Sequence, residues 1–284
     1  MHEYLPSRTA LGVARRRAVH QLLDNPRVFD DPLAVSIIGP EAAARLASEV
    51  STNEHPVSRS LRAFVAVRSR YAEDELTLAV ANGVRQYVVL GAGLDTFACR
   101  NIHAAAGLRV FEIDHPSTQE WKRDLLRTAG IAIPAESVFV PVDFERQSLG
   151  DGLQAAGFDH RQPAFFSWLG VVPYLTEDAF RATMAYIAAM PPGSGVVFDY
   201  GVPRSELNAR EQLARDHLAG RVAAAGEPLQ LFFEPKKLAA QLRTMGFRHV
   251  EDLDAAEINR RYFRDRSDGF ALAGNGTHLL SARV

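Results

Sequence analysis

The chain has little cysteine, little net charge and no long apolar run. Cys99 is the only cysteine in 284 residues, which excludes an internal disulfide and a cysteine-based zinc cluster. Lys and Arg total 32 against 34 Asp and Glu, a formal net charge of −2 that argues against a general nucleic-acid-binding protein. No apolar run approaches the roughly 20 residues of a membrane span. The first residues lack the basic and apolar regions of a signal peptide, so we expect a soluble, cytoplasmic protein.

Apolar residues recur in a pattern that predicts an α/β fold. Beyond residue 84, near-continuous apolar runs alternate with helical stretches, as in a parallel sheet that is covered on both faces. The expected strands cover residues 87–95, 108–114, 137–143, 163–170, 195–201, 249–254 and 277–284, and the expected N-terminal helices cover residues 8–24, 33–49 and 58–82. The sequence therefore predicts a helical cap over residues 1–83 and one doubly wound domain over residues 84–284.

Residues that follow the strands are the candidates for a binding site, because ligands of doubly wound sheets bind beyond the carboxyl ends of the strands. The first strand runs into Gly91-Ala92-Gly93, where missing Cβ atoms let a ligand approach the backbone. Thr96 stands where a dinucleotide fingerprint has its third glycine. Asp114 ends the second strand, 21 residues after Gly93, where nucleotide-binding folds place a carboxylate for ribose hydroxyls. The structural alternative for the glycines is a tight turn with no ligand, and the alternative for Asp114 is a solvated acid at the end of a strand.

Acidic and aromatic residues follow the next two strands. Asp143 and Phe144 end the third strand, where an acid can accept a hydrogen bond from an adenine amino group and an aromatic ring can pack on adenine. The aspartate could equally cap the next helix. The fourth strand leads into Ser167, Trp168 and Tyr174, whose aromatic members could line a substrate pocket, although a tryptophan here is more commonly a core residue.

Together these motifs resemble the leucine carboxyl methyltransferase family, a branch of the class I S-adenosylmethionine (SAM) dependent methyltransferases. The stretches that carry the resemblance are residues 7–18, 28–34, 65–76, 86–100 with GAGLDT, 110–126, 140–145 and 168–176, in that order. The resemblance implies a Rossmann-like, doubly wound sheet that is mostly parallel with an antiparallel last strand. It also implies SAM as the cofactor, S-adenosylhomocysteine as the product, and a helical cap.

The resemblance implies roles for individual residues. The implied cofactor-binding set is Arg68, Gly91, Ala92, Gly93, Asp95, Asp114, His115, Asp143, Phe144, Ser167 and Trp168. Arg68 would bind the carboxylate of the methionine part, which suits an arginine fork; the alternative for Arg68 is a surface ion pair. Asp114 would bind the ribose, and Asp143 with Phe144 the adenine. Well-studied members carry a Glu where this chain has Ser167-Trp168. This difference weakens the inference that the chain shares their substrate, a protein C-terminal leucine, more than it weakens the inference that it binds SAM.

The expected reaction is displacement of the methyl group from the sulfonium by an oxygen of a small molecule or peptide. A carboxylate acceptor is already ionised at pH 7 and needs no base, whereas a hydroxyl acceptor needs one. His115, Trp168, Tyr174 and Tyr200 are candidate pocket residues, with a structural role as the alternative for His115. For a hydroxyl acceptor, His115 and Tyr174 are the candidate bases. The sequence shows none of the common hydrolase or zinc motifs, so it predicts no metal and identifies no definite catalytic residue.

Two other functions stay open. A catalytically inactive SAM-fold protein would bind the cofactor without turnover, and the Ser167-Trp168 departure motivates it. An NAD(P)-dependent oxidoreductase would share the fold, but Thr96 disfavours it. The run Arg15-Arg16-Arg17 is expected to be a solvated helix face rather than a nucleic-acid contact. We expect no nucleic acid and no membrane as partners, and the sequence indicates no oligomeric state.

Overall fold

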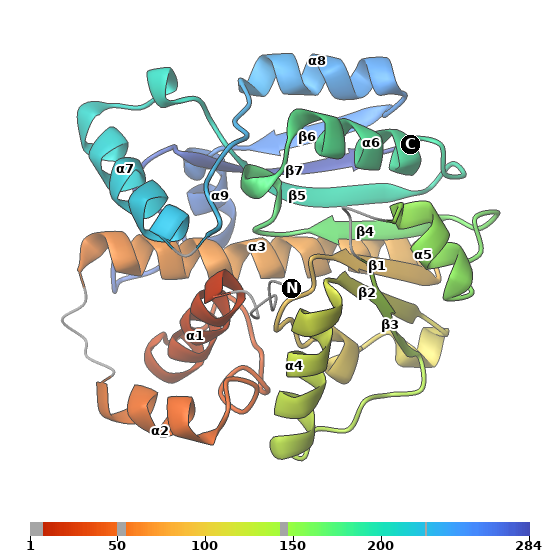
Figure 1. The fold of residues 1–284 in the computed structure, drawn as a ribbon. Helices are drawn as coiled ribbons and strands as arrows, with labels where there is room; N and C mark the ends of the chain where they lie inside the picture. Colours follow the sequence, from red (N-terminus) through yellow and green to blue (C-terminus); the bar gives the residue numbers. More distant parts are fainter. Residues whose placement is uncertain (1–7, 50–54, 143–146, 225) are drawn as a thin grey trace.

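A seven-stranded sheet with helices on both faces forms the body of the protein (Figure 1). The computed structural model describes residues 8–49, 55–142, 147–224 and 226–284. The strands are β1 (Gln86–Leu90), β2 (Arg109–Asp114), β3 (Ser137–Pro141), β4 (Ala164–Trp168), β5 (Gly195–Gly201), β6 (His249–Leu253) and β7 (Thr277–Arg283). Each expected strand is present, and all but the fifth are shorter than predicted, because the residues beyond their ends turn into loops.

The strand order is β3-β2-β1-β4-β5-β7-β6, so the chain starts at the centre of the sheet and later returns to it. Strands β1 to β5 pair in parallel, and β7 runs antiparallel between β5 and β6. The predicted doubly wound sheet with an antiparallel last strand is confirmed. Because the winding direction reverses between β1 and β4, a crevice is expected beyond their carboxyl ends.

Helices precede, connect and follow the strands. They are α1 (Arg8–Leu23), α2 (Pro40–Glu49), α3 (Pro56–Ala81), α4 (Pro116–Thr128), α5 (Leu149–Ala155), α6 (Glu177–Ala188), α7 (Ala209–Ala224), α8 (Pro235–Met245) and α9 (Ala255–Tyr262). The helix predicted over residues 33–49 begins only at Pro40. Residues 33–38 form turns, and Gly39, with φ of 85°, interrupts the chain before the proline that starts α2.

Helix α9 is not among the helices predicted from the sequence. Asp254 caps it by accepting a hydrogen bond from the backbone N–H of Glu257 at 2.8 Å. An acidic cap followed three residues later by Glu is a start signal for a helix, and it was visible in the sequence. The helix spans only 8 residues, too few for its apolar spacing to stand out.

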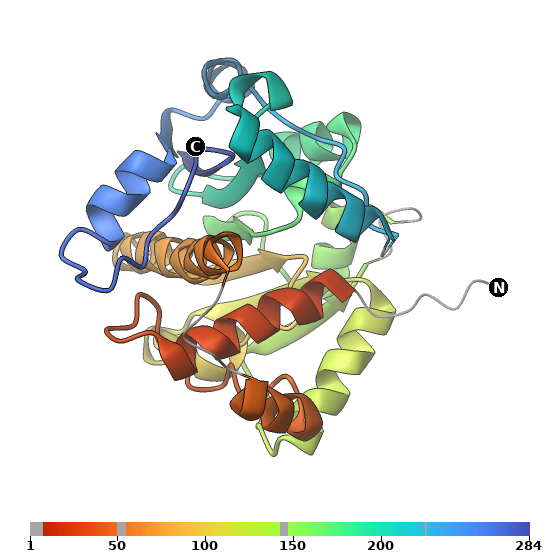
Figure 2. The same cartoon turned by 90° about the vertical axis from the view of Figure 1, so that its left-hand side faces the viewer.

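Each face of the sheet packs against its own hydrophobic cluster. Val88 and Leu90 of β1 join the cluster with α5, α6 and α8, whereas Tyr87 and Val89 join the cluster with α3 and α9. This alternation follows from the period of two along a strand. Helix α1 lies between α3 and α4 (Figure 2). The N-terminal helices therefore lie against the sheet domain, at the end where the site is expected.

A buried ion pair fastens the segment after α1 to α3. Arg62 donates two hydrogen bonds to the carboxylate of Asp24, at 2.9 and 3.1 Å. The ring of His20 lies 2.7 Å from the same carboxylate, and all three residues are buried. Burial alone would raise the pKa of Asp24, but the hydrogen bonds from His20 and Arg62 hold it below its ordinary value.

We expect Asp24→Asn to lower the free energy of unfolding by about 3 kcal/mol, because it removes the buried carboxylate that pairs with Arg62 and His20. Since the pKa of Asp24 is lowered on folding, its contribution is complete above the ordinary aspartate range and is lost as the pH falls through the lowered pKa. Urea unfolding at several pH values measures both effects. The variant should lose part of the wild-type acid sensitivity, and an unchanged stability at pH 7 would contradict the account.

Candidate active site

A cavity of about 250 Å³ opens at the carboxyl ends of β1, β2 and β4, next to α1 and α3. This is the crevice that the strand order predicts. The predicted site residues that line it are Arg68, Gly91, Ala92, Gly93, Asp95, Asp114, Ser167 and Tyr174. We call it the first cavity. Asp143 and Phe144, predicted to bind adenine, lie outside the described residues.

The glycines at the end of β1 are required by both conformation and space. Gly91 and Gly93 have φ of 65° and 48°, in the left-handed region that favours glycine. A Cβ on Gly91 would lie 2.4 Å from a methyl carbon of Val171, and one on Gly93 would lie 3.1 Å from the Cβ of Ala10 in α1. The glycine turn is thus packed between α1 and the segment after β4, with its backbone bordering the cavity.

Asp114 holds the glycine turn from the end of β2. Its carboxylate accepts hydrogen bonds from the backbone N–H of Gly93 at 2.6 Å and from its neighbour His115 at 2.7 Å. Burial raises the pKa of Asp114 in spite of these bonds. A carboxylate has about four lone-pair positions, so it can still accept hydrogen bonds from a ligand. Its predicted role toward ribose hydroxyls stays a prediction.

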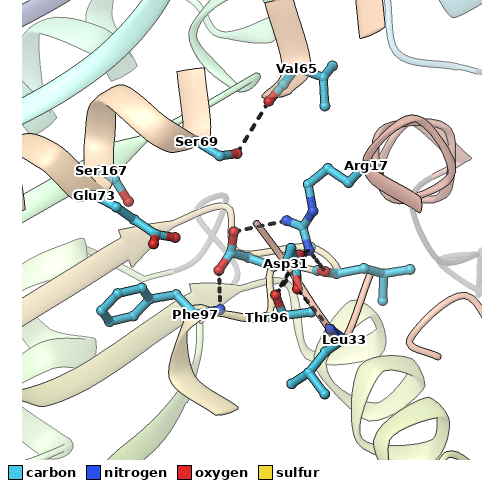
Figure 3. Close-up of polar contacts among 12 residues, drawn as sticks. Arg17, Asp31, Leu33, Val65, Ser69, Glu73, Thr96, Phe97 and Ser167 are labelled. Carbon is cyan, nitrogen blue, oxygen red and sulfur yellow. Dashed lines mark hydrogen bonds and ion pairs between the residues drawn. The ribbon is translucent and has the colours of Figure 1, made fainter. Parts of the chain in front are cut away.

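Asp95 and Thr96 bind the N-terminal segment. Figure 3 shows Thr96 beside Arg17 and Asp31. The Arg17 guanidinium lies 3.0 Å from the carboxylates of both Asp95 and Asp31. Thr96 donates a hydrogen bond to Asp31 at 2.8 Å, and Asp95 also accepts one from the backbone N–H of Phe97 at 2.8 Å. These contacts explain why the turn reads GAGLDT: its last two residues anchor α1 over the cavity, where a dinucleotide motif would have another glycine.

The expectation that Arg15-Arg16-Arg17 forms a solvated face is wrong for two of the three residues. Arg15 is exposed, Arg16 is partly buried, and Arg17 is only 4% exposed. Arg17 lies inside the carboxylate network because its partners come from distant parts of the chain. A run of like charges on one helix does not reveal such partners.

Arg68 reaches the first cavity from α3. It is buried and lies 3.3 Å from Asp199 of β5, so its predicted alternative, a surface ion pair, is wrong. The second carboxylate oxygen of Asp199 accepts a hydrogen bond from the backbone N–H of Gly170 at 2.5 Å. A Cβ on Gly170 would lie 2.7 Å from the guanidinium, so the glycine makes room for it. The contact with Asp199 fixes Arg68 while other N–H donors can face a ligand.

Trp168 does not line the first cavity. Alternation along β4 directs Ser167 toward the cavity and Trp168 to the opposite face of the sheet. There Trp168 stacks on Phe180 of α6, with ring centroids 5.9 Å apart. The core alternative that the sequence left open is the one observed.

Tyr200 and His115 have structural contacts instead of cavity positions. Tyr200 is fully buried in β5 and donates a hydrogen bond to Asp252 at 2.8 Å. His115 begins α4, where its Nδ1 accepts a hydrogen bond from the backbone N–H of Ser117. Every residue of strand β5 is buried, so alternation between buried and exposed positions could not show which way Tyr200 points.

Comparison with known proteins settles the family. The sequence model described as leucine carboxyl methyltransferase matches residues 10–188. The chain belongs to this family. It is a methyltransferase, as the resemblance predicted.

Relatives extend the similarity over most of the chain. A Bacillus subtilis protein named "Putative S-adenosyl-L-methionine-dependent methyltransferase YktD" is 32% identical over 93% of this chain and 94% of its own length. A protein of Mycobacterium avium with the same kind of name is 34% identical over 92% of this chain and 86% of its own. The crystal structure of a "putative methyltransferase" from Thermobifida fusca has a TM-score of 0.58 at 19% identity, over 94% of this chain and 93% of that one. The class I methyltransferase fold is confirmed.

Several residues that line the first cavity of this methyltransferase were not predicted from the sequence. Tyr87 donates a hydrogen bond to Ser167 at 2.7 Å, and burial raises its pKa, so its hydroxyl stays neutral. Ser69 and Glu73 also line the cavity. They are four residues apart on α3, hence on one helix face, and the position of Ser69 next to Arg68 was the available signal. Arg100 pairs with Glu73, but burial still raises the pKa of Glu73.

A second cavity of about 310 Å³ adjoins the first. The residues that line both are Thr9, Val13, Arg68, Gly170 and Tyr174. Burial raises the pKa of Tyr174, so its hydroxyl is neutral at physiological pH. The described residues contain no group of His, Cys, Asp and Glu placed to hold a metal ion. In that part of the chain, too, every helix is too short or too polar to cross a bilayer.

Proposed function

We propose that this methyltransferase transfers the methyl group of SAM to a carboxylate oxygen of a small molecule or peptide. SAM is its methyl donor, and S-adenosylhomocysteine is the second product. The observation that carries the proposal is the convergence of Arg68, the glycine turn and Asp114 on one cavity in a member of this family. We place the donor in the first cavity and the acceptor on the side of the second.

The residues of the first cavity suit the parts of SAM. Arg68 offers a guanidinium to the methionine carboxylate, and the missing Cβ atoms of the turn leave room for the amino-acid part. Asp114 offers a carboxylate to the ribose hydroxyls. Ser167 and Ala92 border the same space. We assign adenine to Asp143 and Phe144 by their place after β3.

The chain contributes position and exclusion of water more than proton transfer. Bound SAM supplies a methyl group on a positively charged sulfur, so attack by oxygen forms the C–O bond while the S–C electron pair stays on sulfur. A carboxylate acceptor loses no proton in this step and needs no base. Tyr174 lines both cavities and, being neutral, can donate a hydrogen bond that orients the acceptor. Helix α1 covers the turn, in keeping with a cap over residues 1–83 and a SAM-binding domain over residues 84–284.

Methyl transfer to matched acceptors tests the proposed acceptor chemistry. Purified enzyme is incubated with SAM that carries a deuterated methyl group and with carboxylic acids, each paired with the alcohol of the same carbon skeleton. Mass spectrometry then detects labelled methyl esters and ethers. We expect esters from acids and no ethers from alcohols. Labelled ethers alone would contradict the carboxylate assignment, and SAM binding without any labelled product would support the inactive binding protein.

A further inference from the structure

The second cavity has apolar walls and an excess of positive charge. Helices α1, α3 and α7 border it, together with the ends of β5 and β7. Its apolar lining consists of Val13, Leu61, Phe64, Val65, Leu218, Val222, Leu229 and Phe232. Among the residues that the structure describes, Arg16, Arg68, Arg215 and Arg221 line it together with one carboxylate, that of Asp199. A ligand that fits this lining is apolar along its body and negatively charged.

The charge excess resides mainly in Arg16 and Arg221. Asp199 is already engaged by Arg68 and by the backbone N–H of Gly170. Arg215 is held by the backbone carbonyls of Val202 and Gly276. Among the described residues, neither Arg16 nor Arg221 forms an ion pair with a carboxylate. The polar contact found for Arg16 is a hydrogen bond to the carbonyl of Gly12 at 2.9 Å.

Electrostatics at Arg16 agree with an unneutralised cluster. Burial lowers the pKa of Arg16, and the positive charges of Arg221 and Arg68 lower it further. Cations that face one another across a partly desolvated cavity repel, and an anion bound between them removes that repulsion. The charges in the second cavity therefore favour binding of a negative group. Arg16 and Arg221 line the second cavity but not the first.

The junction between the cavities is where an acceptor held in the second cavity comes nearest to the donor. A molecule that extends from the second cavity toward the donor site passes Arg68, Gly170 and Tyr174, which are among the residues that border both cavities. Its methylated carboxylate then sits at this junction, away from the arginines that line the second cavity alone. An anion held by Arg16 and Arg221 is thus a second group of the same molecule.

We propose that the acceptor is an organic acid with two anionic groups separated by an apolar body, one methylated at the junction and the other bound by Arg16 and Arg221. This inference rests on the proposed function, because it takes the first cavity as the donor site. It adds what that function leaves open, namely the chemical class of the acceptor and the residues that select it.

Binding of matched acids tests the proposal. Linear dicarboxylates from adipate to sebacate are titrated calorimetrically into enzyme saturated with S-adenosylhomocysteine, each beside the monocarboxylate of equal chain length. The best diacid should bind at least tenfold more tightly than its monoacid. In the double variant Arg16→Gln, Arg221→Gln this preference should fall below twofold. Arg181→Gln, which changes an exposed arginine on α6, is the matched control and should keep the full preference.

Two further measurements separate the possible failures. Thermal unfolding of the double variant should give an equal or higher Tm, because the change removes like charges; a Tm lower by several degrees would show that the arginines are structural and would overturn the proposal. Equal binding of diacids and monoacids would also overturn it. If S-adenosylhomocysteine itself fails to bind the wild type, the proposed function fails first; if it binds and no diacid preference exists, only the present inference fails.

Discussion

Gly91→Ala is expected to weaken SAM binding by at least 100-fold. The new Cβ would lie 2.4 Å from a methyl carbon of Val171, so the turn or the segment after β4 must shift. The substitution also places a side chain at φ of 65°, a conformation that costs L-residues roughly 1–2 kcal/mol. Because the turn lines the first cavity, both effects act where the methionine part is expected. Calorimetric titration with SAM measures the loss.

Gly83→Ala is the matched control for this prediction. Gly83 follows α3 with φ of 95°, but a Cβ there has no neighbour within 4 Å. The control therefore adds the backbone strain without the clash, and it should bind SAM like the wild type. If Gly91→Ala binds SAM as tightly as Gly83→Ala, the glycine turn is not part of the donor site.

Arg68→Gln is expected to raise the Kd for SAM about 100-fold, which corresponds to about 3 kcal/mol for a charge-assisted hydrogen bond to a carboxylate. The change also leaves Asp199 buried without its cation, so we expect a loss of about 3 kcal/mol in the free energy of unfolding. Arg68→Lys keeps the positive charge but not the planar fork, and it should lose about tenfold in affinity while remaining folded.

Arg70→Gln is the control on the same helix. Arg70 pairs with Asp74 at 2.7 Å, but the two side chains are 49% and 40% exposed. Exposed pairs of this kind contribute about 0–1 kcal/mol. Urea unfolding and SAM titration should therefore leave this variant close to the wild type. Equal SAM affinity in Arg68→Gln and Arg70→Gln would contradict the assignment of Arg68.

Local patterns in the sequence were sufficient for the architecture of the sheet and for much of the first cavity. Apolar runs with helices between them predicted every strand, and the residues that follow the parallel strands predicted where the crevice lies. The spacing of Asp114 from Gly93 placed both at one site, where a hydrogen bond joins them. The apolar runs are local features of the sequence. The location of the site follows from the rule that the carboxyl ends of parallel strands lie at the same edge of the sheet.

The features of the site that the sequence did not predict depend on tertiary contacts. Ser167 and Trp168 are adjacent in the sequence, and only the packed sheet shows that one faces the cavity and the other the core. Arg17 meets Asp31 and Asp95, which are distant along the chain. The second cavity forms where α1, α3 and α7 come together, so no single stretch of the sequence predicts it.

Titration of SAM into the wild type and into Asp114→Asn tests the central claim most directly, namely that the first cavity is the donor site. The asparagine keeps the shape of the side chain and one oxygen for the backbone of Gly93, but it loses the carboxylate charge and the second oxygen, which accepts a hydrogen bond from the backbone N–H of His115. We predict that the wild type binds SAM with a single site and that Asp114→Asn stays folded, with a slightly lower Tm, and binds SAM at least tenfold more weakly. No binding by the wild type, or equal affinity in both proteins, would contradict the account.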